Sequence, residues 1–194
     1  MEIPINTFND TSYYYLSTKY LAKKIKSPDL TKSKDSLHII FNYENQMIDV
    51  WTVNYSTYYG FISNYTNTHL NYRDKKNKFK KRQFYFDTVN LDTAIARKIN
   101  AIYNFHSVIK ITSEENFEGW LAICDGKAYS IEYSTPQFYN FKSWSSLWNY
   151  RYRISEAAII DSLFNEIDSL LGLETYYNSF LKPYLWDVIV WGII

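Results

Sequence analysis

The hydrophobic period of this chain changes once, near Trp148, and that change restricts the fold more than any other feature. Before it, apolar and aromatic residues gather in short runs typical of strands. These runs lie at 37–44, 46–55, 56–65, 83–89, 119–124, 127–133 and 139–144. After it, apolar residues recur at the helical spacing of about 3.6 residues. They are Ile160, Leu163, Phe164, Ile167, Leu170 and Leu171. This order predicts an α+β fold, in which an antiparallel sheet of hairpins has one intervening helix and further helices pack at the C-terminal end.

Capping residues and prolines predict where the helices begin and end. Asp10 or Thr11 can cap a first helix, which ends before Ser27-Pro28 because a residue that precedes proline is disfavoured in the helical conformation. The last long helix has Ser155 as its expected N-cap and Gly172 as its expected C′ residue. The apolar stripe expected on the first helix is Tyr14, Leu16, Tyr20, Leu21 and Ile25.

The length of 194 residues predicts a single α+β domain over 1–194. Residues 1–35 are expected to form the N-terminal helix and a loop. Residues 36–150 are expected to be mainly sheet, with a helix near 91–104 that Asn90 to Asp92 can cap. Residues 151–194 are expected to supply the helical end and an apolar tail.

The chain has only five Gly and four Pro, so each one is informative. Gly60 lies inside a strand-like run and predicts a bulge or a close approach of another backbone. Asp125-Gly126 is a two-residue hairpin signal, and Pro136 fixes φ in the next turn. Together these turns predict a three-stranded meander. Its strands are 119–124, 127–133 and 139–144.

The composition favours sheet and broad contact surfaces, because the chain has 20 Tyr, 12 Phe and 6 Trp. A net charge of +1 supplies no overall field that would attract nucleic acid or acidic lipid. The single cysteine, Cys124, allows no internal disulfide and fits a reducing compartment. No signal peptide or run of about 20 apolar residues is present, so we expect a cytoplasmic protein without a membrane span.

The sequence has no motif that predicts reaction chemistry. His38, His69 and His106 are far apart and begin no HxxxH pattern, so we interpret them as structural or solvated. Cys124 ends an apolar run and is interpreted as a buried, inert thiol. No GxSxG, GxGxxG or phosphate-binding loop occurs. We therefore expect no cofactor, no metal ion and no enzymatic activity.

Two acids, Asp125 and Glu132, flank one predicted strand and are the remaining catalytic candidates. Asp125 occupies the position that a hairpin turn favours, and Glu132 is expected on the sheet surface with Lys142 as its cross-strand partner. A metal nuclease would place Glu-x-Lys on the second strand, but Tyr133 and Ser134 follow Glu132. Turn and sheet-surface roles therefore explain both acids.

Charge is segregated along the chain. Seven basic residues and one acid lie between Arg73 and Arg82. The basic residues are Arg73, Lys75, Lys76, Lys78, Lys80, Lys81 and Arg82. These basic side chains could bind phosphates. We expect instead that the run is a solvated hairpin tip, and so we do not expect nucleic acid as a partner. From Ile154 onward the chain has six acids and only Lys182 as a base, so the polarity suits a charged protein partner or head-to-tail self-association.

The hairpin carries a motif of the form D-G-x-x-[WY]-x-[IL]-E followed by Y-x-[FV]-x-x-[WY]. The matching residues are Asp125, Gly126, Tyr129, Ile131, Glu132, Tyr139, Phe141 and Trp144. In this order of features, over about residues 37–185, the chain resembles a diffuse group of uncharacterised small bacterial proteins, many from the Bacteroidetes. The group's common proline after the aromatic pair is replaced by Ser145 and Ser146. The resemblance implies the same fold and supplies no catalytic residues.

Three functions remain open. The first is a non-enzymatic protein-binding protein, most concretely an immunity or antitoxin-type inhibitor of a cognate bacterial toxin. Its expected partner surface is Tyr139, Trp144, Trp148, Glu166 and Asp168. The second is a nucleic-acid-binding protein or metal-dependent nuclease that uses the 73–82 run, with Asp125 and Glu132 as metal ligands. The third is a self-assembling structural subunit whose apolar tail, Trp186–Ile194, pairs between chains. The oligomeric state is left open.

Overall fold

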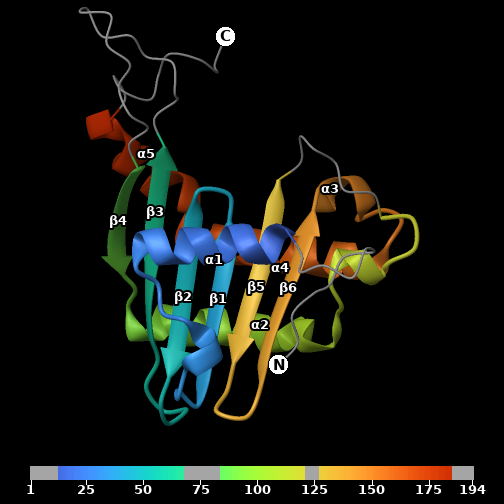
Figure 1. Ribbon diagram of the computed structural model, residues 1–194, viewed down its shortest axis with the longest axis horizontal. Coiled ribbons are helices and arrows are strands. Elements are labelled where there is room, and N and C mark those ends of the chain that lie inside the picture. Colours follow the sequence, from blue (N-terminus) through green and yellow to red (C-terminus); the bar gives the residue numbers. More distant parts are fainter. Residues whose placement is uncertain (1–12, 68–83, 121–126, 185–194) are drawn as a thin grey trace, which may run out of the picture.

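The computed structural model describes residues 13–67, 84–120 and 127–184. Its centre is a six-stranded antiparallel sheet with the strand order β4-β3-β2-β1-β5-β6 (Figure 1). The strands are β1 (Leu37–Tyr43), β2 (Gln46–Thr52), β3 (Tyr59–Asn67), β4 (Phe84–Asn90), β5 (Ala128–Ser134) and β6 (Tyr139–Ser145). The α-helices are α1 (Tyr13–Ile25), α2 (Thr93–Phe105), α3 (Leu147–Tyr150), α4 (Ser155–Leu171) and α5 (Leu173–Leu181). Short 3-10 turns occur at Leu30–Lys32, Val108–Lys110, Glu114–Asn116 and Lys182–Tyr184. The α+β fold with C-terminal helices is therefore confirmed.

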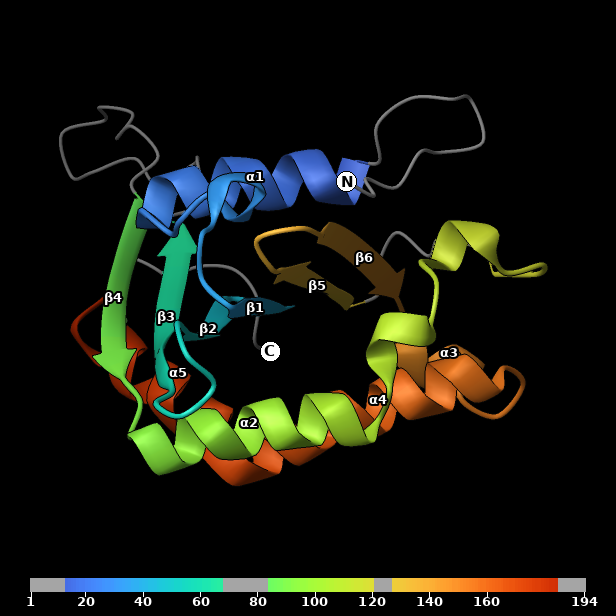
Figure 2. The ribbon, with the colours of Figure 1, turned by 90° about the horizontal axis from the view of Figure 1, so that it is seen from below.

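The helices cover the sheet unequally. Figure 2 shows α1 on one face, with α2 and α4 side by side on the other. Side chains alternate between these faces along each strand. On β1, Ile39 and Phe41 face α2 and α4, whereas Ile40 joins the smaller cluster under α1. The layers are thus a single helix, the sheet and a helical layer.

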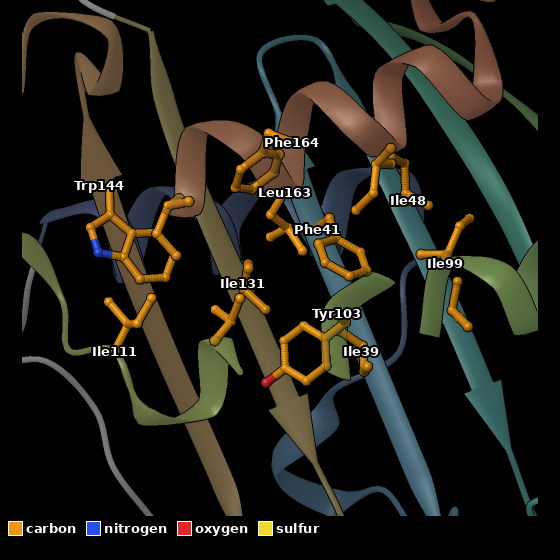
Figure 3. Packing of buried hydrophobic residues seen from close by; sticks show 14 of the residues in the cluster. Ile39, Phe41, Ile48, Ile99, Tyr103, Ile111, Ile131, Trp144, Leu163 and Phe164 are labelled. Carbon is orange, nitrogen blue, oxygen red and sulfur yellow. The ribbon is translucent and has the colours of Figure 1, made fainter. Parts of the chain in front are cut away.

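The larger core lies between the sheet and α4. Figure 3 shows Phe41 and Ile131 of the sheet facing Leu163 and Phe164 of α4. The Phe41 and Phe164 rings meet edge to face at 6.3 Å, and Trp144 is fully buried at the β6 end of the same core. The predicted stripe on α4 is confirmed, except that Leu170 is only partly buried.

The capping predictions were partly correct. Asp92 caps α2, since its carboxylate accepts from the Ala94 backbone N–H at 2.7 Å. Gly172 adopts φ 64° at the end of α4, a conformation that glycine tolerates best. The N-cap of α4 is Ile154 rather than Ser155, which is the first helical residue. The positions proposed to cap α1, Asp10 and Thr11, lie outside the described residues.

Gly60 confirms a close backbone approach. A Cβ atom built at this position would lie 2.7 Å from the carbonyl oxygen of Asp49 on the neighbouring strand. Because a backbone atom at that distance must move, only glycine fits here without a shift.

The expected meander is wrong. β5 lies between β1 and β6 and pairs with both, so the run at 119–124 is not its neighbour. Residues 121–126, which include Cys124 of that run and the following Asp125, lie outside the described residues. The outer edge of β6 forms a hydrogen bond with the segment near Ser113 instead. The Ser143 backbone N–H donates to the Ser113 hydroxyl at 3.2 Å.

Candidate functional site

The structure does not bring the five residues of the expected partner surface together. Tyr139 and Trp144 are 4% and 0% exposed and belong to the clusters on opposite faces of the sheet. This separation follows from strand geometry, because residues five apart in a strand point to opposite faces. Trp148 is 64% exposed, whereas Glu166 and Asp168 lie on α4. Only Trp148 and Glu166 of this set remain as exposed side chains.

Glu132 is buried, so the expectation of a sheet-surface role is wrong. It is 1% exposed, because α1 covers this face, and its carboxylate lies 2.5 Å from the Lys19 ammonium of α1. The Tyr139 hydroxyl donates to the same carboxylate oxygen at 3.0 Å. Lys142 is not its partner. That residue pairs in register with Ile131 and points to the other face.

The basic run at 73–82 and the acid Asp125 lie outside the described residues. The second ligand of the suggested nuclease site, Glu132, is buried, and one of its carboxylate oxygens forms an ion pair with Lys19. Within residues 13–67, 84–120 and 127–184, no group of three or more His, Cys, Asp or Glu side chains could hold a metal ion.

A buried histidine lies between two carboxylates in the interior. His38 on β1 places Nε2 2.5 Å from Oδ1 of Asp49 on β2. Its Nδ1 lies 2.9 Å from Oδ2 of Asp35, which also accepts from the Ser33 hydroxyl at 3.0 Å. Carboxylates accept hydrogen bonds and do not donate them when ionised. With both carboxylates ionised, both ring nitrogens carry protons, so this geometry fits the imidazolium form of His38.

The electrostatics of His38 agree with this assignment. Burial by itself would lower the pKa of His38, but the hydrogen bonds and negative charges of Asp49 and Asp35 outweigh it and raise the pKa above its usual value of 6.5. Burial also raises the pKa of Asp49, and the bond from His38 opposes that rise. His38 is thus a structural histidine, as expected from its sequence context.

Three aromatic rings lie beside this histidine on strands β2 and β3. We call Trp51, Tyr59 and Phe61 the aromatic platform. The Trp51 and Tyr59 rings stack at 5.7 Å with an interplanar angle of 25°, and Phe61 meets Trp51 nearly edge-on at 5.8 Å. Tyr59 is 45% exposed, whereas Trp51 and Phe61 are half-buried. The platform is therefore an open aromatic surface on the sheet face that α1 covers elsewhere.

One side of the platform packs against the His38 ring. The His38 ring lies 5.7 Å from the Trp51 ring, and these residues pair in register between β1 and β2. Since His38 is held by two carboxylates, Trp51 has a side chain with little rotational freedom as its cross-strand neighbour.

The hairpin loop beside the platform is also tied to the sheet. The Thr52 hydroxyl donates to the Thr57 carbonyl at 2.7 Å, and the Tyr55 hydroxyl donates to the Ser36 carbonyl at 2.7 Å. Val53 and Tyr55 are 56% and 59% exposed. The loop therefore presents two exposed side chains, of which that of Tyr55 is anchored by a hydrogen bond.

Sequence reasoning missed the platform although it identified both strands. The expected second strand continued to Tyr55, and the third began at Ser56, which leaves no loop. In the structure, residues 53–58 form the connection, and this sets Trp51 opposite Tyr59. A loop of defined length was the missing information, because it determines which aromatic residues become cross-strand neighbours.

The fold and site define a class: an α+β protein with a six-stranded antiparallel sheet, one helix on one face, a helical layer on the other, and an aromatic surface. Among the described helices, none has the length and apolar character needed to cross a membrane. No protein-family model matches the chain, and no curated protein matches it either.

Proposed function

We propose that this protein acts by binding another protein, and that the aromatic platform is the centre of the contact surface. The observation that carries the proposal is the exposure of stacked, pre-positioned rings at Trp51 and Tyr59. Trp and Tyr are enriched among the residues that dominate binding energy. A surface that is already rigid loses little side-chain entropy when it binds.

The most concrete form of this proposal is a bacterial immunity or antitoxin-type protein that inhibits a cognate toxin. Such an inhibitor needs a shaped surface and no reaction chemistry of its own. Aromatic surfaces can also stack nucleic-acid bases, but that mode combines the rings with cationic side chains that follow the phosphates. His38 lies beside Trp51 between the carboxylates of Asp35 and Asp49, and carboxylates in this position favour a protein partner over a phosphate backbone.

The test begins with capture of the partner from the native host through a salt wash, followed by affinity measurement with the purified partner. We expect Trp51→Ala and Tyr59→Ala each to weaken binding by about 30-fold, which corresponds to about 2 kcal/mol. Trp148→Ala is the matched control, since it removes an exposed aromatic side chain outside the platform.

Circular dichroism must show that all three variants remain folded. If the two platform variants bind as tightly as Trp148→Ala, the platform is not the contact surface. If nucleic acid is what the protein captures, the proposed class of partner is wrong.

A further inference from the structure

Helix α1 packs on the sheet through a contact that contains buried polar side chains. Figure 1 shows the helix crossing one face of the sheet, and its buried residues are Thr18, Ala22 and Ile25. Opposite Thr18 lie Asn42 of β1 and Ser130 of β5, which are 8% and 4% exposed. Burial of a polar side chain costs free energy unless its hydrogen bonds are made in the folded protein. Three polar residues at one place in this contact therefore need partners.

The hydrogen bonds among these three side chains are incomplete. The Asn42 amide donates through Nδ2 to the Ser130 hydroxyl at 2.9 Å. The hydroxyl oxygens of Thr18 and Ser130 are 3.5 Å apart, which is at the long limit for a hydrogen bond. Among the described residues, none supplies a hydrogen bond to Oδ1 of Asn42, which is buried. This acceptor remains for an O–H or N–H donor that the described part of the chain does not provide.

A pocket of about 210 Å³ lies between α1 and this part of the sheet. Thr18, Asn42 and Ser130 belong to its lining, and so do Tyr65 and Tyr129. The terminal torsion of an asparagine is broad, so a modest rotation of the amide turns Oδ1 of Asn42 toward the pocket. The pocket thus combines aromatic residues with a few convergent polar groups, which is the usual composition of a small-molecule site.

Charge and size restrict the class of ligand. Of the described residues in the lining, only Glu44 carries a charge at pH 7, and the Lys127 ammonium lies 2.5 Å from its carboxylate. The ligand therefore has no uncompensated charge to pair with. Hydroxyl and amide groups both donate and accept hydrogen bonds, and they match a ligand that does the same. The volume is below the range of about 300–1,000 Å³ that is typical of drug-sized ligands, so the ligand is small.

We propose that this pocket binds a neutral polyhydroxyl compound of the size of a monosaccharide. One ligand hydroxyl donates to Oδ1 of Asn42, and others exchange hydrogen bonds with Thr18 and Ser130. The C–H groups of the ligand pack on Tyr65 and Tyr129. The site shares no residue with the aromatic platform, so this inference is independent of the proposed function.

Isothermal titration calorimetry of the full chain tests the ligand class. The probes are glucose, galactose, mannose and myo-inositol, together with the amino and uronic acid derivatives of the three sugars. We expect one of the neutral compounds to bind at one site per chain, and charged derivatives to bind at least about 10-fold more weakly, because the pocket offers no counter-charge. The methyl glycoside of a sugar that binds distinguishes two sources: a site for the end of a glycan accepts it, and a site for the free sugar does not.

The variant Asn42→Leu tests the position of the site, since it keeps the approximate size of the side chain and removes the amide. Asn100→Leu is the matched control. Asn100 is also 8% exposed, and its Oδ1 likewise has no partner among the described residues, but it lies on α2 and outside the lining. We expect Asn42→Leu to weaken binding by about 10-fold or more and Asn100→Leu to leave it unchanged. Circular dichroism must show that both are folded; if Asn42→Leu is not, Ala128→Leu, which fills the pocket from β5, takes its place.

Three results would overturn the inference. A pocket that holds only water binds none of the four neutral compounds at millimolar concentrations. Charged derivatives that bind as tightly as the neutral sugar show that the ligand class is wrong. Equal affinities of the pocket variant and of Asn100→Leu place the binding site elsewhere on the chain.

Discussion

Removal of the His38 side chain leaves the buried Asp49 carboxylate beside the aromatic platform without its ion-pair partner. In His38→Leu, the Asp49 carboxylate loses its 2.5 Å partner while it remains 0% exposed. Loss of one partner from a buried ion pair costs roughly 3–5 kcal/mol, because an uncompensated charge stays in the interior. Asp35 is 26% exposed, so water can replace its bond to His38 at smaller cost. We therefore expect a loss of roughly 3–5 kcal/mol in the free energy of unfolding at pH 7.

A second substitution separates lost charge compensation from lost packing. In the double variant His38→Leu with Asp49→Leu, no buried charge remains, and apolar side chains replace the pair. Replacement of a buried pair by apolar residues is often close to neutral in stability. We expect the double variant to be more stable than His38→Leu by about 2 kcal/mol or more, within that same range of buried-pair energies.

Urea unfolding followed by circular dichroism measures these differences. His106→Leu is the matched control, because the ring of His106 lies 3.0 Å from a carboxylate, that of Glu166, which is 49% exposed. A pair with an exposed partner is worth about 1 kcal/mol or less. If His38→Leu costs no more than His106→Leu, or if the double variant is as unstable as the single one, the assignment of a charged, buried pair is refuted.

Three further predictions follow from single features of the structure. Because the pKa of His38 is raised in the folded protein, its contribution to stability is fully present below the unfolded pKa of about 6.5 and is lost as the pH rises through the folded pKa. The free energy of unfolding of the unmodified protein, measured with urea from pH 6 to 9, should therefore decline, and the decline should be smaller in His38→Leu. Parallel pH profiles would contradict this. Gly60→Ala should lower the free energy of unfolding by about 1–3 kcal/mol, since the added Cβ would lie 2.7 Å from the Asp49 carbonyl oxygen. An unchanged urea midpoint would show that β2 and β3 can move apart at no cost in stability. Asp92→Ala should cost about 1 kcal/mol in the same assay because α2 loses its N-cap, while Asp92→Asn, which can still cap, should cost less; equal losses would assign the effect to charge instead.

Local features of the sequence predicted local structure well. The stripe on α4 and the glycine at its end were correct, because a helix pattern of this length has few alternatives. The prediction for Gly60 was also correct, since a glycine inside a strand often marks a close approach of a neighbouring backbone. These signals depend on residues that are close in the chain.

Pairing between distant segments could not be derived in the same way. One neighbour of β5 is β1, which lies about 90 residues earlier in the chain, since Ile40 pairs with Glu132. The alternation of apolar residues along a strand indicates that one face of the strand is covered, but it does not indicate which element covers that face. The burial of Glu132 under α1 was therefore missed, and the stripe predicted for α1 included Leu16 and Tyr20, which are exposed.

One error in the expected partner surface was avoidable from the sequence. Tyr139 and Trp144 are five residues apart in a predicted strand, so strand periodicity alone assigns them to opposite faces. The aromatic platform was different, because Trp51 and Tyr59 become neighbours only through a loop whose length the sequence did not reveal. Strand propensity identified β2 and β3, but the length of the loop between them determined which aromatic residues form the platform.

The most direct test of the central claim is a quantitative comparison of partner capture in the native host. The tagged unmodified protein, the double variant Trp51→Ala with Tyr59→Ala, and Trp148→Ala are each purified through the same salt wash, and the proteins that remain bound are quantified by mass spectrometry. The account predicts one stoichiometric protein partner that is retained by the unmodified protein and by Trp148→Ala but lost from the platform variant. Equal recovery of that partner by all three proteins would contradict the account.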